Sequence, residues 1–78
     1  MKQIVIQVSD ETAASLHELA VRCSEEEQRR EGFTSHGALS VAALMAMLAE
    51  DAAMVITRPG SWEGANMTQV LASHGYDI

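Results

Sequence analysis

Three histidines and two pairs of adjacent carboxylates are the side chains of this sequence best suited to acid–base chemistry. The histidines, His17, His36 and His74, are far apart along the chain, and no HExxH motif, nucleophile elbow or phosphate-binding glycine loop accompanies them. The carboxylate pairs fall on predicted helices, where neighbouring side chains point about 100 degrees apart and cannot share a proton across a substrate. We therefore expect no catalytic residue and no enzymatic activity.

Sulfur-containing side chains also suggest no cofactor. Cys23 is the only cysteine, so the chain can form no internal disulfide, and neither a CxxC spacing nor a Cys/His cluster indicates a metal site. A small hydrophobe packed on a helix is the simplest role for Cys23, and the methionines between residues 45 and 54 are typical of adaptable core filling. We predict neither a metal nor another cofactor.

Length and charge limit the classes of function. A chain of 78 residues forms one domain near the size at which a single core barely offsets chain entropy, and dimerisation is the usual remedy. The start lacks the apolar segment of a signal peptide, and the longest apolar run is too short to span a membrane. We expect a cytoplasmic protein without membrane contact. Its net charge of −6 opposes binding to nucleic-acid phosphates unless the basic side chains cluster.

The first ten residues, MKQIVIQVSD, alternate like a β-strand that runs straight into a helix. One face of this strand would be apolar and carry Ile4, Ile6 and Val8. The opposite face would carry Gln3, Val5 and Gln7. No convincing second strand follows, and a lone strand leaves its backbone groups unpaired. The pattern predicts a homodimer in which two copies pair these strands, with the apolar face in the dimer interface.

A first helix is predicted to begin after Ser9, which is suited to cap it, and acidic residues in the first turn favour the helix dipole. One apolar stripe recurs at helical spacing: Leu16, Leu19, Ala20 and Cys23. The charged stretch SEEEQRRE then extends to Gly32. We interpret it as the solvated end of the same helix, with Arg29 and Arg30 near its C-terminus, and an acidic contact surface is the alternative.

A second, strongly apolar helix is predicted after Gly32. Thr34 or Ser35 is suited to cap it, and nearly every side chain from Ala38 to Ile56 is apolar. Because a helix that is apolar around most of its circumference needs cover on several sides, we expect a second subunit to bury it. The dimer interface is therefore predicted to include three side chains of this helix: Leu44, Met47 and Leu48.

Residues 57–78 are predicted as an extension of a dimerisation domain that spans residues 1–56. A proline and a glycine in the turn before Ser61 break the second helix. Ser61 can cap a short third helix through about Ser73. The extension could pack on the dimer, swap onto its partner or bind another protein. It carries two of the three aromatic side chains, which could anchor a core or an interface: Trp62 and Tyr76.

Three motifs occur in a specific order over roughly residues 2–55: IxIxVSDE at the N-terminus, LHELA in the first helix, and GFTSHGAL in the turn before the second helix. Together they resemble the ribbon-helix-helix family of DNA-binding regulators. The resemblance implies a mainly α-helical chain with one N-terminal β-strand. Two copies would form an intermolecular antiparallel two-stranded ribbon, to which this chain adds a short C-terminal helix.

By this resemblance, the ribbon would enter the major groove of double-stranded DNA and present Gln3, Val5 and Gln7 to base edges. A glutamine amide can bond adenine bidentately, and a valine methyl can contact the thymine methyl. Backbone N–H groups around Thr34, Ser35 and His36 would hold a phosphate, although simple capping uses the same geometry.

The resulting prediction is a homodimeric, sequence-specific transcriptional regulator or repressor. The alternative is a protein-interaction dimer, which would act as an antitoxin-like, adaptor or inhibitor module through the acidic helix or the C-terminal tail. The net charge of −6 and the aromatic side chains of the tail favour this alternative.

Overall fold

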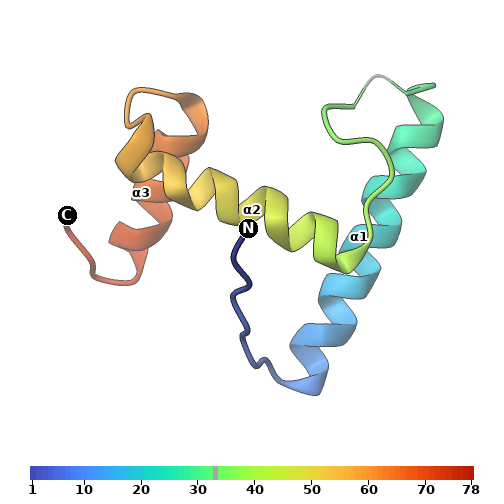
Figure 1. The fold of residues 1–78 in the computed structure, drawn as a ribbon, viewed down its shortest axis with the longest axis horizontal. Coiled ribbons are helices and arrows are strands. Elements are labelled where there is room, and N and C mark those ends of the chain that lie inside the picture. Colours follow the sequence, from blue (N-terminus) through green and yellow to red (C-terminus); the bar gives the residue numbers. More distant parts are fainter. Residues whose placement is uncertain (33) are drawn as a thin grey trace. The chain divides into compact units, whose positions relative to one another are not determined.

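The computed structural model describes residues 1–32 and 34–78 and shows three α-helices within them (Figure 1). Helix α1 spans Asp10–Arg29, α2 spans Val41–Thr57 and α3 spans Trp62–Ser73. The chain divides into two compact units, residues 1–42 and 43–78. Phe33, which belongs to the GFTSHGAL motif, lies outside the described residues.

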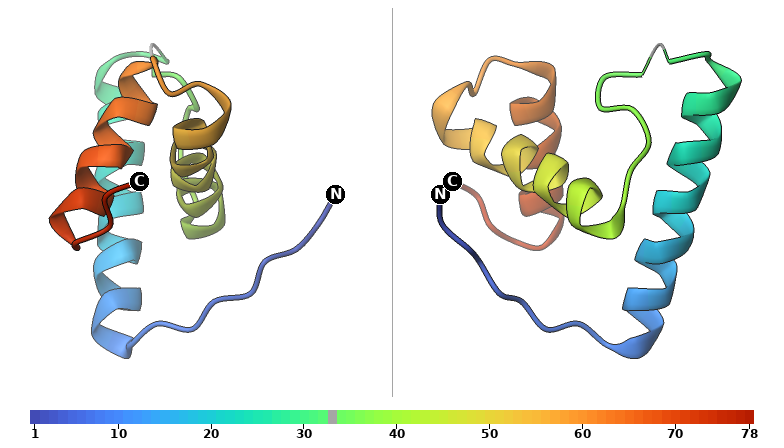
Figure 2. Two further views of the ribbon diagram at one scale, coloured as in Figure 1. Left: turned by 90° about the vertical axis from the view of Figure 1, so that its left-hand side faces the viewer. Right: turned by 45° about the vertical axis from the view of Figure 1, so that its right-hand side comes forward.

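The predicted fold class, with an N-terminal strand and an intermolecular ribbon, is wrong because the described residues contain no β-strand. Residues 1–9 instead form an extended segment that leads into α1 (Figure 2). A strand needs a partner for its backbone as well as alternating side chains. The regular elements of the described chain are helices, whose backbone groups are bonded internally, so the alternating segment finds no strand to pair with.

Helix α1 begins where the sequence predicts. Ser9 is its N-cap, and the Ser9 hydroxyl accepts a hydrogen bond from the backbone N–H of Thr12 at 3.1 Å. The helix ends at Arg29, and the chain then reverses through two residues with left-handed backbone, Glu31 (φ 53°) and Gly32 (φ 90°). The Gly32 N–H bonds back to the carbonyl of Glu27 at 3.1 Å, which closes the helix end.

Two side chains of α1 hold the loop that leads to α2. The Ser24 hydroxyl accepts a hydrogen bond from the Leu39 N–H at 2.9 Å, and it lies 3.1 Å from the Leu39 carbonyl and 3.0 Å from the Ala20 carbonyl. A hydroxyl has one proton, so it donates to one of these carbonyls at a time. One turn further on, the Glu27 carboxylate accepts from the Thr34 N–H at 3.3 Å. The loop is therefore tied to α1 near both of its ends.

The prediction that Thr34 or Ser35 caps the second helix is wrong, because α2 begins at Val41. A cap at either residue would place Gly37 inside the first turn of the helix. Gly37 has φ 66°, in the left-handed region that a right-handed helix cannot contain. The chain therefore stays irregular until it has passed this glycine.

The C-terminal unit contains most of α2, a tight turn and α3. Its predicted third helix is confirmed, with Ser61 as the N-cap and Ser73 as the last helical residue. The Ser61 hydroxyl accepts from the Gly64 N–H at 3.0 Å and donates to the Arg58 carbonyl at 2.7 Å, so it joins the turn to the helix.

Gly64 allows α3 to approach the end of α2 closely. A Cβ atom at this position would lie 2.6 Å from the Arg58 carbonyl oxygen and 2.8 Å from that of Met54. Both atoms belong to the backbone and cannot rotate away. Glycine weakens a helix interior by its flexibility, but here the absence of a side chain is what permits the helices to pack.

Two hydrophobic side chains are fully buried among the described residues, Ala20 in α1 and Leu44 in α2. Leu44 is 2 % exposed within a single chain, while Met47 and Leu48, also expected in a dimer interface, are half-buried. Within residues 1–32 and 34–78, no helix combines the length and the apolar character required to cross a bilayer.

Candidate functional site

The residues expected to contact DNA bases lie on the extended N-terminal segment. Gln3, Val5 and Gln7 are exposed, and no hydrogen bond within the described residues involves the side chain of either glutamine. Base readout requires side chains held at a fixed spacing on a rigid element. In the described chain, this segment has no partner that would hold the three side chains in register.

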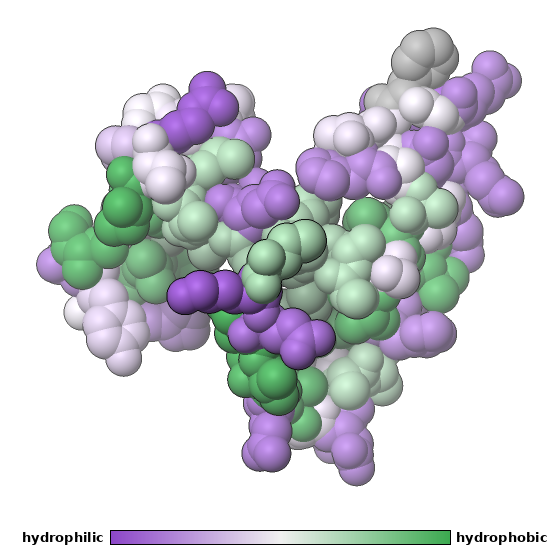
Figure 3. Space-filling view, viewed as in Figure 1, coloured by the Kyte–Doolittle hydropathy of each residue, from purple (hydrophilic) through white to green (hydrophobic). Residues whose placement is uncertain are grey.

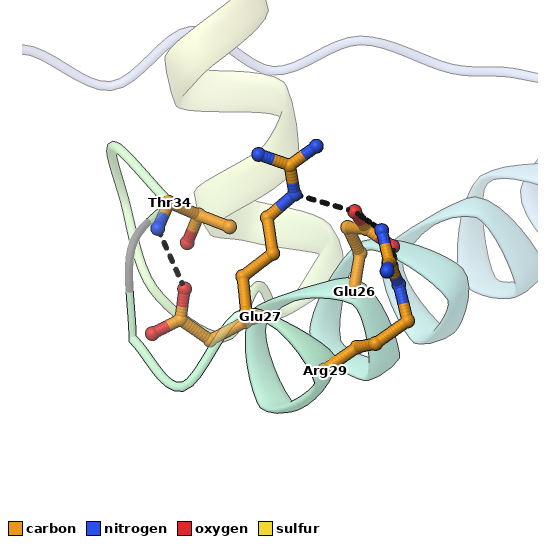
Figure 4. Close-up of polar contacts among 5 residues, drawn as sticks. Glu26, Glu27, Arg29 and Thr34 are labelled. Carbon is orange, nitrogen blue, oxygen red and sulfur yellow. Dashed lines mark hydrogen bonds and ion pairs between the residues drawn. The ribbon is translucent and has the colours of Figure 1, made fainter.

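The residues expected to bind phosphate lie in the α1–α2 loop and not at a helix N-terminus. The Thr34 N–H is already bonded to the Glu27 carboxylate, which occupies the position that an anion would take (Figure 4). The Ser35 hydroxyl lies 2.7 Å from Nδ1 of His36, and both side chains are exposed. A phosphate would meet a negative charge here, where the prediction placed free N–H groups.

The two arginines of α1, and Arg30 at its C-cap, are all paired with glutamates of this helix. Arg22 bonds Glu18 at 2.9 Å, and Arg29 and Arg30 bond the same oxygen of Glu26 at 2.6 and 2.7 Å (Figure 4). The hydrogen bonds from Arg29 and then Arg30 lower the pKa of Glu26 from 4.5 to about 2. Glu26 in turn raises the pKa of Arg29.

Three of the five basic side chains are thus engaged in ion pairs within the chain, and a DNA phosphate would have to compete with these glutamates. The stretch is largely exposed, as interpreted from the sequence, but Glu27 has a structural role that the sequence analysis missed. The sequence signal for this role of Glu27 was the pair of glycines at positions 32 and 37. They permit a chain reversal that brings the loop back to the last turn of α1.

Groups suited to catalysis do not converge in the part of the chain that the structure describes. It contains no cluster of three or more His, Cys, Asp or Glu side chains that could hold a metal ion. The Ser35–His36 contact resembles the first two members of a nucleophilic triad, but no carboxylate bonds the other nitrogen of the imidazole within the described residues. This pair therefore lacks the group that would orient it.

An open groove of 540 Å³ lies on the C-terminal unit. Its walls come from the end of α2, the turn, one side of α3 and the last residue of the sequence, and five of the six lining residues are apolar: Val55, Ile56, Pro59, Ala65, Thr68 and Ile78. The space-filling view shows apolar side chains exposed on this unit as well as elsewhere on the chain (Figure 3). Residues from four segments of the chain thus form one largely apolar surface that is open to water.

Large apolar side chains beside the groove remain exposed. Ile56 and Ile78, which line it, are 80 % and 77 % exposed, and Trp62, one helical turn before Ala65, is 77 % exposed. The C-terminal unit also carries four carboxylates and one basic side chain: Glu50, Asp51, Glu63, Asp77 and Arg58. An apolar surface on an acidic unit is suited to a ligand that is apolar and positively charged.

The sequence analysis singled out the C-terminal tail for its aromatic residues but did not find the groove. Ala65 and Thr68 carry no chemical signal, and they become groove walls only because Gly64 brings α3 against the end of α2. Three comparisons with known proteins add no further guide: no protein-family model, no curated protein and no solved structure matches this chain.

Proposed function

We propose that this chain is a protein-interaction module that binds an apolar, positively charged segment of a partner protein in the groove of the C-terminal unit. The apolar lining of that groove, left open to water, is the observation that carries the proposal. The module acts as an adaptor or inhibitor rather than as an enzyme. A single cysteine fits a reducing compartment, so we place it in the cytoplasm.

Exposed apolar area supplies the driving force. Complete burial of a side chain such as Ile56 or Ile78 contributes about 1.5–3 kcal/mol. A partner segment that covers both, together with the neighbouring Trp62, gains enough to offset part of the cost of association. Tryptophan is also among the residues that most often dominate protein interfaces.

Charge supports a protein partner over a DNA duplex. The acidic C-terminal unit attracts a cationic segment and repels phosphates. Arg22, Arg29 and Arg30 are paired with two glutamates of α1, so a phosphate backbone would have to compete with these carboxylates for them. A regulator that bound DNA through the N-terminal segment would have a single basic side chain there, Lys2, to contact the phosphates.

Trp62 provides a direct test, because it is the only tryptophan and lies one helical turn before the groove residue Ala65. The probe is a synthetic amphipathic helix of leucine and lysine, and its matched control has glutamate in place of lysine. We expect saturable binding of the lysine peptide, with a blue shift of the Trp62 emission, and binding at least about tenfold weaker for the glutamate peptide. Equal binding of both peptides, or no saturable binding of either, would contradict the proposal.

A matched pair of variants locates the contact. Ala65→Lys places a cation in the groove, whereas Ala14→Lys makes the same charge change on an exposed position of α1. We expect the first variant to weaken binding of the lysine peptide by about tenfold or more and the second by less than about threefold. Similar losses in both variants would show that overall charge, and not the groove, determines binding.

A further inference from the structure

The extended N-terminal segment, residues 1–8, has the chemistry that the C-terminal groove is suited to bind. It carries Lys2 and no acidic side chain, and its apolar side chains are exposed. Ile4 and Val5 are 86 % and 89 % exposed, and Ile6 is 59 % exposed. Within the described residues, no hydrogen bond involves the backbone of this segment. It is thus an apolar, cationic stretch that forms no hydrogen bond with the described part of its own chain.

We propose that residues 1–8 of one copy bind in the groove of the C-terminal unit of a second copy. This inference rests on the proposed function, because it names the segment that occupies the same groove. Alternation decides which side chains enter: Ile4, Ile6 and Val8 share one face of the extended chain and contact the groove. The opposite face, with Gln3 and Gln7, stays in water, where its amides and the exposed backbone remain hydrated.

A second copy is favoured because one chain buries so little. Ala20 and Leu44 are the fully buried hydrophobic residues among those described, and chains of this length commonly need an additional source of stability. A twofold dimer lets each copy give its segment and receive the other, so both grooves are filled by one symmetric arrangement. The charges are complementary, because the segment carries Lys2 and the receiving unit has four carboxylates and one basic side chain, Arg58.

Reciprocal docking differs from pairing of two N-terminal segments with each other. In docking, the dimer depends on groove residues such as Ala65 as well as on Ile4 and Ile6. In segment pairing, the groove takes no part and a change at Ala65 leaves the dimer intact. The two arrangements can therefore be separated by variants.

The first measurement is the oligomeric state of the full chain by sedimentation, with and without a synthetic peptide of residues 1–9. We expect a dimer at about 50 µM chain, which corresponds to a micromolar affinity. An excess of the peptide should convert it to a monomer without changing the Trp62 emission, because one copy of the segment replaces another in the groove. A control peptide with Ile4→Ser and Ile6→Ser should leave the dimer intact. The wild-type measurement does not depend on the folding of any variant.

Mixing two variants gives the decisive experiment. The double variant Ile4→Ser, Ile6→Ser has a defective segment and an intact groove, and Ala65→Lys has the reverse. We expect each to be monomeric alone and the mixture to form a heterodimer through the one intact contact. Val5→Ser, on the opposite face of the segment, is the matched control and should dimerise as the wild type does.

The other outcomes identify other occupants and overturn the inference. An intact dimer in Ala65→Lys, together with a monomer in the Ile4→Ser, Ile6→Ser variant, would indicate segment pairing. A wild-type monomer at every concentration would exclude a second copy, and a change of Trp62 emission in the double variant would then indicate docking within one chain. If the lysine peptide binds and the peptide of residues 1–9 does not, this inference fails and the proposed function stands. If neither binds, both fail.

Discussion

Each of the two compact units is stabilised internally by a different kind of contact. In the N-terminal unit, the polar side chains of Ser24 and Glu27 tie an irregular loop to α1. In the C-terminal unit, α2 and α3 approach so closely at Gly64 that a single added methyl group would overlap two carbonyl oxygens. Polar ties can be exchanged for water at modest cost, whereas backbone overlap cannot be relieved by a side-chain rotation. The C-terminal unit should therefore tolerate substitution less well where the helices meet.

The largest expected effect is that of Gly64→Ala. Because the new Cβ would lie under 3 Å from backbone atoms of Arg58 and Met54, the helices must separate. We expect a loss of about 2–4 kcal/mol in the free energy of unfolding, measured by urea denaturation followed through Trp62 fluorescence. Separation of the helices should also weaken peptide binding in the groove.

Gly60→Ala is the matched control for this change. Nothing lies within 4 Å of a Cβ at Gly60, and its backbone is not in the left-handed region. We expect a change within about 0.5 kcal/mol. Equal losses at the two glycines would mean that close packing does not distinguish Gly64.

An intermediate effect is expected from Ser24→Ala in the N-terminal unit. The substitution removes the acceptor of the half-buried Leu39 N–H and the tie between α1 and the end of the loop. We expect a loss of about 1–2 kcal/mol and faster hydrogen exchange at the Leu39 amide. Ser15→Ala, at an exposed position of α1, should leave that exchange rate unchanged. Unaltered exchange in Ser24→Ala would show that the loop is held by other contacts.

The smallest effect concerns the exposed ion pairs at the end of α1. Since the folded pKa of Glu26, about 2, lies below its ordinary 4.5, these pairs contribute stability that is fully present above pH 4.5 and is lost as the pH falls towards 2. Carboxyl NMR should show Glu26 ionised at pH 3. Arg29→Gln should raise this pKa, and added salt should weaken the pairs. A Glu26 titration near 4.5 in the wild type would contradict the pairing.

Local chemistry made part of this fold predictable. Ser9 and Ser61 cap helices through bonds to residues only three positions away, and the proline and glycine before Ser61 end α2 without reference to the rest of the chain. Such signals depend on neighbours in the sequence. For this reason, α1 and α3 begin where the sequence analysis expects.

Contacts between distant residues were not predictable in the same way. Residues 1–8 have the side-chain pattern of a strand, but strand formation requires a backbone partner that the pattern does not specify. The start of α2 depends on Gly37, whose left-handed backbone is visible only in the folded loop. The groove depends on the approach of α3 to α2 at Gly64. Glycine has a low helix propensity, so propensity alone would argue against a helix at this position.

Glu31 has a left-handed backbone conformation, so a substitution at this position can raise the stability of the protein. A residue with a side chain loses about 1–2 kcal/mol in that conformation, while glycine adopts it freely. The Glu31 side chain has no hydrogen bond or ion pair among the described residues, so its removal sacrifices no such contact. Glu31→Gly should therefore raise the melting temperature by several degrees, and scanning calorimetry would measure the gain. The turn after α1 is a natural first position for thermostabilisation.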